Sequence, residues 1–247
     1  MRAGLAIRLA VLALLVGFLA APQSFAPLFE PLTRNGQPAI YTQNALLNLT
    51  IGHLAIVAVA TLASTLVGVG LAIVVTRPFG AEFLPLSRSL ANVGQTFPPV
   101  AVLALAVPLL GFGTAPTLVA LFLYGLLPIF ENALTGLTTL PAAVSEAARG
   151  VGMTDAQRLG QVELPLAAPV ILAGIRLSVV ISIGTATIGS TVAAATLGEV
   201  IIAGLLSGNL AFVAQGGLVV AVVAVLTHDG LAGLERLLTR RTGQGAR

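Results

Sequence analysis

The charged side chains of this 247-residue chain that could do chemistry are concentrated in one short stretch. Only 9% of the residues are charged, yet five charged side chains lie within eighteen positions: Glu146, Arg149, Asp155, Arg158 and Glu163. Apolar runs flank the stretch on both sides, so we expect a loop exposed to water at a membrane face. Charges of both signs on such a loop can form ion pairs and hydrogen bonds with a protein partner.

Helix signals on either side of a glycine pair predict how this loop is built. Pro141 fits the first turn of a helix that runs to about Gly150, where its missing N–H costs nothing. Gly150 and Gly152 interrupt the chain. Thr154 then fits an N-cap, and Gln157 completes a capping box three residues later. The sequence therefore predicts two short helices joined by a sharp bend, which together present a rigid surface to a partner.

Several kinds of chemistry are excluded by the residues that the chain lacks. Without cysteine there is no disulfide or thiolate ligand, and His53 and His228 are too far apart in sequence to suggest zinc. Without lysine the chain cannot supply a Walker A phosphate-binding loop, so any ATP must be hydrolysed by another polypeptide. A serine hydrolase would need Ser182 or Ser190, and no Gly-x-Ser-x-Gly elbow surrounds either serine.

Composition places the chain among polytopic membrane proteins. It is 57% hydrophobic with a mean hydropathy of +1.01, which excludes a soluble globular domain. The arginines responsible for the net charge of +3 are scattered singly between apolar runs, so they indicate topology and not nucleic-acid binding. The runs predict about six membrane helices, at residues 5–21, 46–75, 90–110, 117–137, 166–188 and 210–227.

The predicted spans divide the chain into three parts. Residues 1–44 form an N-terminal helix and an extracytoplasmic linker, residues 45–235 form the transmembrane core with the loop 141–165, and residues 236–247 form a tail. The run 5–21 could be a cleaved signal peptide, but its length near the lower limit for a span favours a retained helix. With six spans, every loop or tail arginine except Arg34 falls on one side, which places both termini and the loop in the cytoplasm.

Broken and polar helices suggest where a translocation path could run. The third predicted span contains Asn92, Gln95 and Thr96 beside two prolines, and the fifth contains Thr185 and Thr187 among small residues. Helix breaks in a bilayer occur where the helix lines a cavity or packs on protein. Tight helix packing is the alternative explanation for these small and hydroxyl side chains.

Charged groups at membrane depth are further candidates for the path. Arg176 lies eleven residues beyond Pro165, about 16 Å along a helix, and Glu131 at the end of the fourth span is its expected partner. A purely structural ion pair is the alternative. Glu199 lies in the irregular segment after the fifth span. We expect His53 and His228 to anchor the chain at the membrane interfaces.

The loop resembles the EAA motif of the membrane-spanning subunits of ABC importers. Glu146-Ala147-Ala148, Gly152 and Leu164-Pro165 fit its spacing, with Val162 at a position that is usually isoleucine. The resemblance implies an all-α fold with the five-helix core of type I importers, here with an added N-terminal helix. It also implies a coupling helix, at about residues 154–161, that docks into a separate ATPase. The implied coupling residues are Glu146, Ala147, Ala148, Gly152, Thr154, Asp155, Gln157, Arg158, Leu164 and Pro165.

The core further resembles the osmoprotectant branch of this family, which imports glycine betaine, choline and carnitine. The similarity covers about residues 45–235 and is carried by segments such as 95–99, 108–113, 121–129 and 173–176. The chain departs from it at Glu131, where many relatives have arginine, and at 193–198. Tyr124, within one matching segment, joins the path candidates Asn92, Gln95, Thr96, Glu131, Arg176, Thr185, Thr187 and Glu199.

The resemblance also implies partners. These are two ATPase subunits that carry ATP and magnesium, a second permease subunit of the same or a sister chain, and an extracytoplasmic substrate-binding protein. No cofactor is expected in this chain. It has no tryptophan and only Tyr41 and Tyr124, so a high-affinity aromatic cage for a quaternary ammonium group is not expected either. The alternatives are an ion-coupled secondary transporter, which would show inverted repeats, a channel, or an ABC permease for another solute such as an amino acid.

Overall fold

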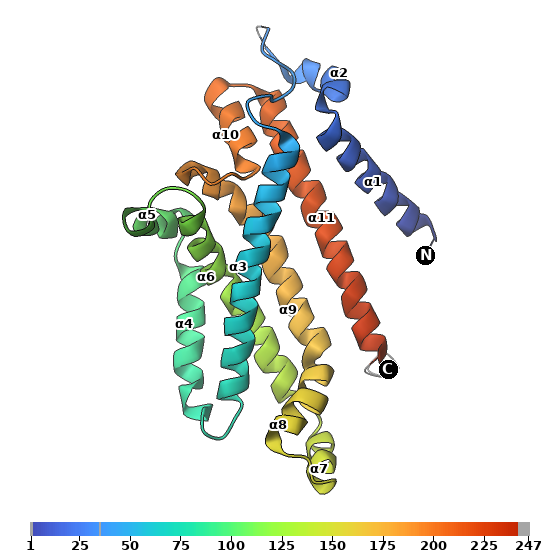
Figure 1. Ribbon diagram of the computed structural model, residues 1–247, viewed down its shortest axis with the longest axis vertical. Coiled ribbons are helices and arrows are strands. Elements are labelled where there is room, and N and C mark those ends of the chain that lie inside the picture. The colour runs from blue at the N-terminus through green and yellow to red at the C-terminus, as the bar shows by residue number, and fades with distance from the viewer. Residues whose placement is uncertain (1, 35, 242–247) are drawn as a thin grey trace. The chain divides into compact units, whose positions relative to one another are not determined.

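The computed structural model describes residues 2–34 and 36–241, and every regular element in those ranges is a helix (Figure 1). Four helical stretches are long and apolar enough to cross a membrane, and the number is up to six if each of two bent helix pairs is one span. The predicted all-helical membrane fold is thereby confirmed. The long helices are α3 (Leu46–Val75), α6 (Thr114–Thr138), α9 (Leu164–Thr185) and α11 (Leu210–Arg241).

Shorter helices complete the chain. Short 3₁₀ turns flank α2, and a 3₁₀ segment, Ala186–Val192, follows α9. The predicted span 46–75 matches α3 at both ends, whereas α11 continues well past residue 227, so the predicted tail 236–247 begins inside a helix. The shorter α-helices are α1 (Arg2–Ala20), α2 (Ala26–Phe29), α4 (Leu84–Thr96), α5 (Pro99–Leu110), α7 (Ala142–Gly150), α8 (Asp155–Arg158) and α10 (Gly198–Ser207).

The predicted third span, 90–110, is not one continuous helix. It is divided into α4 and α5 at Phe97, whose ψ of 133° is extended. Pro98 explains the break, because the ring of a proline disfavours helical geometry in the residue before it. Pro99 then occupies the first turn of α5, where no N–H is needed.

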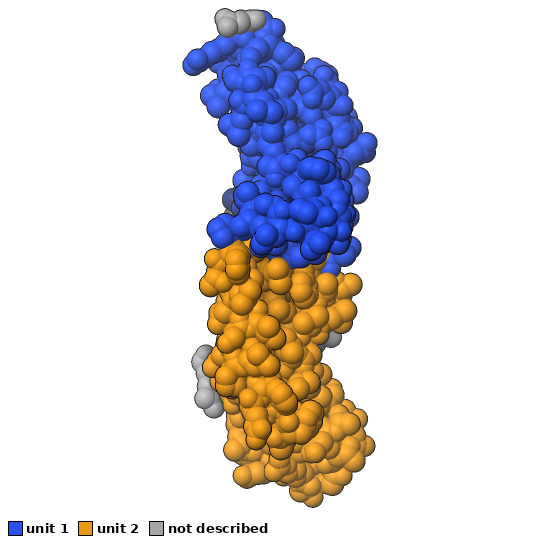
Figure 2. Space-filling view, turned by 90° about the vertical axis from the view of Figure 1, so that its left-hand side faces the viewer, with its two compact units in different colours: residues 1–59, 98–121, 180–227 blue, residues 60–97, 122–179, 228–247 orange. Residues whose placement is uncertain are grey.

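The residues fall into two compact units, which Figure 2 colours separately. Unit 1 is drawn from residues 1–59, 98–121 and 180–227, and unit 2 from residues 60–97, 122–179 and 228–247. In unit 1, the chain bends by 114° between α1 and the short helices of residues 22–32, and the end of α1 packs on them. Phe18 contacts Phe25 and Phe29 there, with ring centroids 5.3 and 5.6 Å apart.

The core of unit 2 is built from α3, α4, α6 and α9. Its buried residues include Ala72, Ala91, Phe130, Ala133 and Ala167. Small residues bring the helices together, because backbones can approach closely where side chains are short. A Cβ placed on Gly174 of α9, for example, would lie 2.6 Å from the Asn132 Cβ and 2.7 Å from the Pro128 carbonyl oxygen of α6.

Candidate functional site

The charged loop of unit 2 contains α7 and a sharp bend, as the sequence predicts. The second predicted helix begins where expected, with α8, but it is not a separate short helix, because the helical stretch continues from Asp155 to Val192. The bend requires glycine at one position, Gly152, where φ is +83°. L-residues with a Cβ rarely adopt this geometry. Pro141 differs slightly from the prediction, since it is the N-cap residue of α7 and does not lie in its first turn.

The predicted capping box at the start of α8 is confirmed. The Gln157 N–H donates to Thr154 Oγ1 over 3.3 Å, and the Thr154 N–H donates to Gln157 Oε1 over 2.9 Å. The α-helix ends at Arg158, and a π-helical turn, Leu159–Glu163, carries the chain into α9. The loop is therefore joined to the long helix that follows it by continuous helical structure.

A buried ion-pair network fixes the inner face of the loop. The Glu163 carboxylate accepts a hydrogen bond of 2.6 Å from Arg77 Nη2 and one of 2.8 Å from Arg158 Nε. Arg158 also pairs with Asp155 over 2.9 Å. Arg158 and Glu163 are each only 7% exposed, and charges buried in this way need partners of opposite sign. The network ties the loop to the segment that follows α3.

The loop residues divide into an inner and an outer set. Ala148 and Arg158 are buried and hold the loop in place, and Leu164 packs against the unit 2 core. Behind the loop lies a hollow of about 520 Å³, whose charged lining residues are Arg77, Arg149, Arg158, Asp155 and Glu163. The outer set is exposed and available to a partner: Glu146, Ala147, Gly152, Thr154, Asp155, Gln157 and Pro165.

Two of the predicted path residues in unit 2 are brought together. Gln95 Nε2 donates to the Tyr124 carbonyl oxygen over 3.1 Å, and the Tyr124 hydroxyl donates to the Phe97 carbonyl oxygen over 2.6 Å. These bonds hold the end of α4 against α6 and satisfy a carbonyl at the helix break. Asn92 and Thr96 are exposed on α4.

The predicted pairing of Arg176 with Glu131 is wrong. Glu131 accepts hydrogen bonds of 2.8 and 3.2 Å from Arg88 of α4. Arg176 pairs with Glu235 of α11 over 3.1 Å, and its Nη1 lies 3.3 Å from His228 Nε2. The prediction failed because the last helix was expected to end near residue 227, whereas α11 continues and brings Glu235 beside α9.

The remaining path candidates belong to unit 1. The Thr187 hydroxyl donates to the Gly184 carbonyl oxygen over 2.7 Å, within the segment that follows α9, and Thr185 is half-buried at the end of α9. Glu199, in the first turn of α10, accepts a hydrogen bond of 2.7 Å from the Tyr41 hydroxyl. Among the described residues, no group of three or more side chains is arranged to hold a metal ion.

Residues 66–240 match the model of a family described as "binding-protein-dependent transport system inner membrane component". This chain belongs to that family. The permease is 41% identical over 197 residues to the osmoprotectant import permease protein OsmY of Salmonella typhimurium, covering 80% of this chain and 84% of the relative. It is 40% identical over 195 residues to the choline transport system permease protein OpuBB of Bacillus subtilis, and the match covers 78% of this chain and 88% of the relative. It is 39% identical over 178 residues to the carnitine transport permease protein OpuCD of Listeria monocytogenes, and the match covers 69% of this chain and 80% of the relative.

The permease also shares its fold with solved ABC transporters. A chain of the inward-facing MetNI methionine transporter superposes with a TM-score of 0.70 at 20% identity, covering 78% of the permease and 96% of that chain. A chain of an amino acid ABC transporter superposes with a TM-score of 0.60 at 19% identity, covering 79% of the permease and 92% of that chain. These superpositions confirm the predicted MetI-like fold of the core. The alternatives of a channel and an ion-coupled secondary transporter are set aside by the family match over residues 66–240 and by the permease relatives.

Some polar residues of the permease that fix the fold were not predicted. His53 was expected at a membrane interface, but it is fully buried in unit 1, with Nε2 2.9 Å from the Ile183 carbonyl oxygen. Its Nδ1 accepts a longer bond of 3.4 Å from the Leu197 N–H. Gln215 is also fully buried and bonds to Tyr41 and Ala39. The only sequence signal for both was a polar residue within an apolar run.

Proposed function

We propose that this permease forms the membrane path of an ATP-driven importer for quaternary ammonium osmoprotectants of the glycine betaine, choline and carnitine type. The assignment of the substrate class rests on one observation. The permease is 41% and 40% identical to permeases named for osmoprotectant and choline transport, over most of its own length and of theirs. The shared fold with methionine and amino acid transporters does not bear on the substrate, because identity to those chains is about 20%.

The energy for transport comes from a separate ATPase. The chain contains no lysine, so it has no Walker A loop. ATP and magnesium bind to two partner ATPase subunits, and this chain carries no cofactor of its own. The coupling loop 141–165 is the docking surface, with Glu146, Asp155 and Gln157 exposed on its outer side. Its inner side transmits the displacement through Arg77, Arg158 and Glu163.

Membership of the family supports the other partners of the proposal. A second permease subunit, identical or a sister chain, completes the path, and an extracytoplasmic binding protein selects and delivers the substrate. The permease lies in the inner membrane of a prokaryote with both termini and the coupling loop in the cytoplasm, as the distribution of arginines indicates. The exposed polar face of α4, with Asn92, Gln95 and Thr96, contributes to the path.

Uptake by the complete importer tests this function. The permease, the ATPase and the binding protein would be reconstituted together in proteoliposomes with ATP enclosed, and labelled choline, glycine betaine, carnitine and methionine would be supplied outside. We expect ATP-dependent accumulation of at least one quaternary ammonium compound and none of methionine. Accumulation of methionine alone would contradict the substrate class, and ATP hydrolysis by the purified permease alone would contradict the division of labour.

A further inference from the structure

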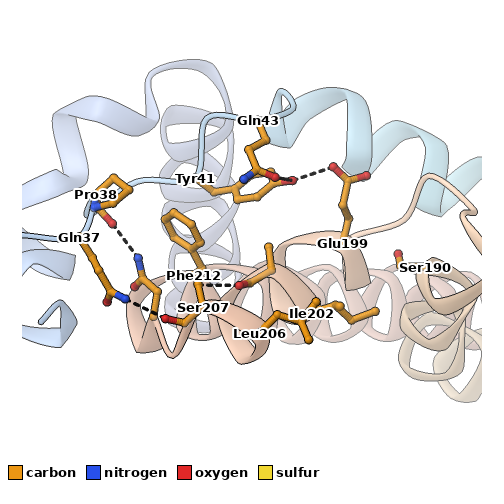
Figure 3. A pocket seen from close by; sticks show the side chains of 12 residues that line it. Gln37, Pro38, Tyr41, Gln43, Ser190, Glu199, Ile202, Leu206, Ser207 and Phe212 are labelled. Carbon is orange, nitrogen blue, oxygen red and sulfur yellow. Dashed lines mark hydrogen bonds between the residues drawn. The ribbon is translucent and has the colours of Figure 1, made fainter.

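Unit 1 contains a hollow of about 610 Å³ that is not part of the coupling loop (Figure 3). It lies between the segment 37–43, which precedes α3, and residues of α10 and α11. Its walls are partly apolar, with Ile202, Leu206 and Phe212 among them. Glu199 is the one charged residue among the described side chains that line it.

The Glu199 carboxylate is held in place by a buried tyrosine. The Tyr41 hydroxyl donates to Glu199 Oε1 over 2.7 Å, as Figure 3 shows. Tyr41 is itself 2% exposed, and its ring meets Phe212 edge-on at 5.3 Å. Its N–H donates to Gln215 Oε1 over 3.2 Å. Several contacts fix the Tyr41 side chain, which in turn orients the Glu199 carboxylate. Glu199 has no cationic partner among the residues that the structure describes.

The protonation of Tyr41 supports this role. Burial raises the pKa of the Tyr41 phenol above its usual value, and the hydrogen bond to Glu199 raises it further. The phenol therefore stays protonated and remains a donor at physiological pH. Glu199 Oε2 has no hydrogen-bond partner among the described residues, so one carboxylate oxygen is left for a ligand.

The chemistry of this hollow fits one class of ligand. A trimethylammonium group is a cation with an apolar surface and no N–H to donate, which suits a single carboxylate beside apolar walls. The buried Tyr41 ring offers too little surface for an aromatic cage, so the charge on Glu199 supplies the attraction. Gln37 Oε1 is a further buried acceptor without a partner in the described part of the chain, and it suits a ligand with a hydroxyl group.

We propose that Glu199, oriented by Tyr41, is a binding site for quaternary ammonium cations that lack a carboxylate, with choline as the model ligand. The proposal rests on the proposed function, from which the quaternary ammonium class is taken. Glycine betaine and carnitine each bring a carboxylate into a hollow where none of the described lining residues is a cation. They therefore bind there more weakly than choline does.

The aromatic content of the chain makes this site easy to observe. With no tryptophan and two tyrosines, the variant Tyr124→Phe leaves Tyr41 as the only tyrosine fluorophore. The full-length variant in lipid vesicles would be titrated with choline, tetramethylammonium and glycine betaine, with sodium chloride as the ionic-strength control. We expect a saturable change in tyrosine fluorescence with the two cations, at concentrations about tenfold lower than glycine betaine requires.

When Glu199→Gln is added to the Tyr124→Phe variant, the choline concentration at the midpoint of the fluorescence titration should rise about tenfold, because a neutral amide replaces the carboxylate. Glu82→Gln is the matched control, since it removes an exposed carboxylate outside the hollow and should leave the midpoint unchanged. Equal midpoints for choline and glycine betaine, or a midpoint unaffected by Glu199→Gln, would overturn the proposal. The comparison of ligands needs no change at Glu199, so it holds even if that variant does not fold.

The uptake experiment separates this proposal from the function on which it rests. If the complete importer accumulates quaternary ammonium compounds while the titration shows no response to choline, only the Glu199 site is wrong. If the importer accumulates none of them, the proposed function fails, whatever the titration shows.

Discussion

The side chains of Arg77 and Glu163 meet over 2.6 Å, and this contact joins the segment after α3 to the end of the coupling loop. Glu163 is shared with Arg158 of α8, so one carboxylate holds two arginines from different parts of unit 2. Both arginines and the carboxylate are largely shielded from water. A displacement of the loop must therefore move the end of α3 with it or break a buried ion pair.

Replacing Glu163 with Gln should destabilise the permease by about 2 to 3 kcal/mol, because two arginines lose the charge that compensates them in a buried site. Thermal unfolding of the purified permease measures this. Asp155→Asn is the matched control: Asp155 also contacts Arg158, but its side chain is 85% exposed, so the midpoint should stay at the wild-type value. Equal effects of the two substitutions would show that the buried network does not stabilise the loop.

Replacing Gly152 with Ala should lower the coupling of ATP hydrolysis to uptake. At φ +83° a Cβ costs about 1 to 2 kcal/mol, which distorts the bend between α7 and α8. The measurement is the ratio of substrate imported to ATP hydrolysed by the complete importer. Gly150→Ala is the control, since Gly150 lies in α7 and a Cβ there meets no described atom within 4 Å. Normal coupling in Gly152→Ala would contradict the docking role of the bend.

A double-mutant cycle should identify the partner of Arg176. We expect the changes Arg176→Ala and Glu235→Ala to be coupled by up to about 1 kcal/mol in thermal unfolding, because the two side chains are paired and 26% exposed. Arg176→Ala and Glu131→Ala should instead be additive, since Glu131 pairs with Arg88. Coupling of Arg176 to Glu131 with none to Glu235 would reject the observed arrangement.

Two glycines of α9 should respond oppositely to the same substitution. Gly174→Ala should destabilise the permease by about 1 to 3 kcal/mol, because its Cβ would overlap Asn132 and Pro128 of α6. Gly184→Ala should be neutral or stabilise the helix by up to about 1 kcal/mol, since no described atom lies within 4 Å of the added Cβ. Thermal unfolding of the two variants provides the comparison, and a smaller loss at 174 than at 184 would refute it.

Local signals in the sequence were enough to predict the elements of the coupling loop. The capping box of Thr154 and Gln157 and the glycine bend depend on residues within a few positions of one another, and both are confirmed. The ends of α3 were predicted for the same reason, since a long apolar run bounded by polar residues determines them. The break at Phe97 was signalled by Pro98 and Pro99, but its result, two separate helices, was not predicted.

The pairing of side chains across helices depended on the tertiary structure. Arg176 has several carboxylates at comparable distances along the sequence, and only the continuation of α11 brings Glu235 to it. His53 was placed at an interface because a histidine near the end of a span often lies there, yet the fold buries it against Ile183. Arg77 and Glu163, separated by 86 positions, gave no local sign that they meet.

The sequence by itself determined the membrane class, the glycine bend and capping box of the loop, and the absence of a phosphate-binding lysine, because composition and local backbone preferences are properties of the chain. Only the tertiary structure decided which charges are compensated and which remain available. Glu163, Glu131 and Glu235 are paired with arginines, whereas Glu199 is held by the Tyr41 hydroxyl and faces a hollow. The physical reason is that the free energy of a buried charge depends on what the fold places within a few ångströms of it.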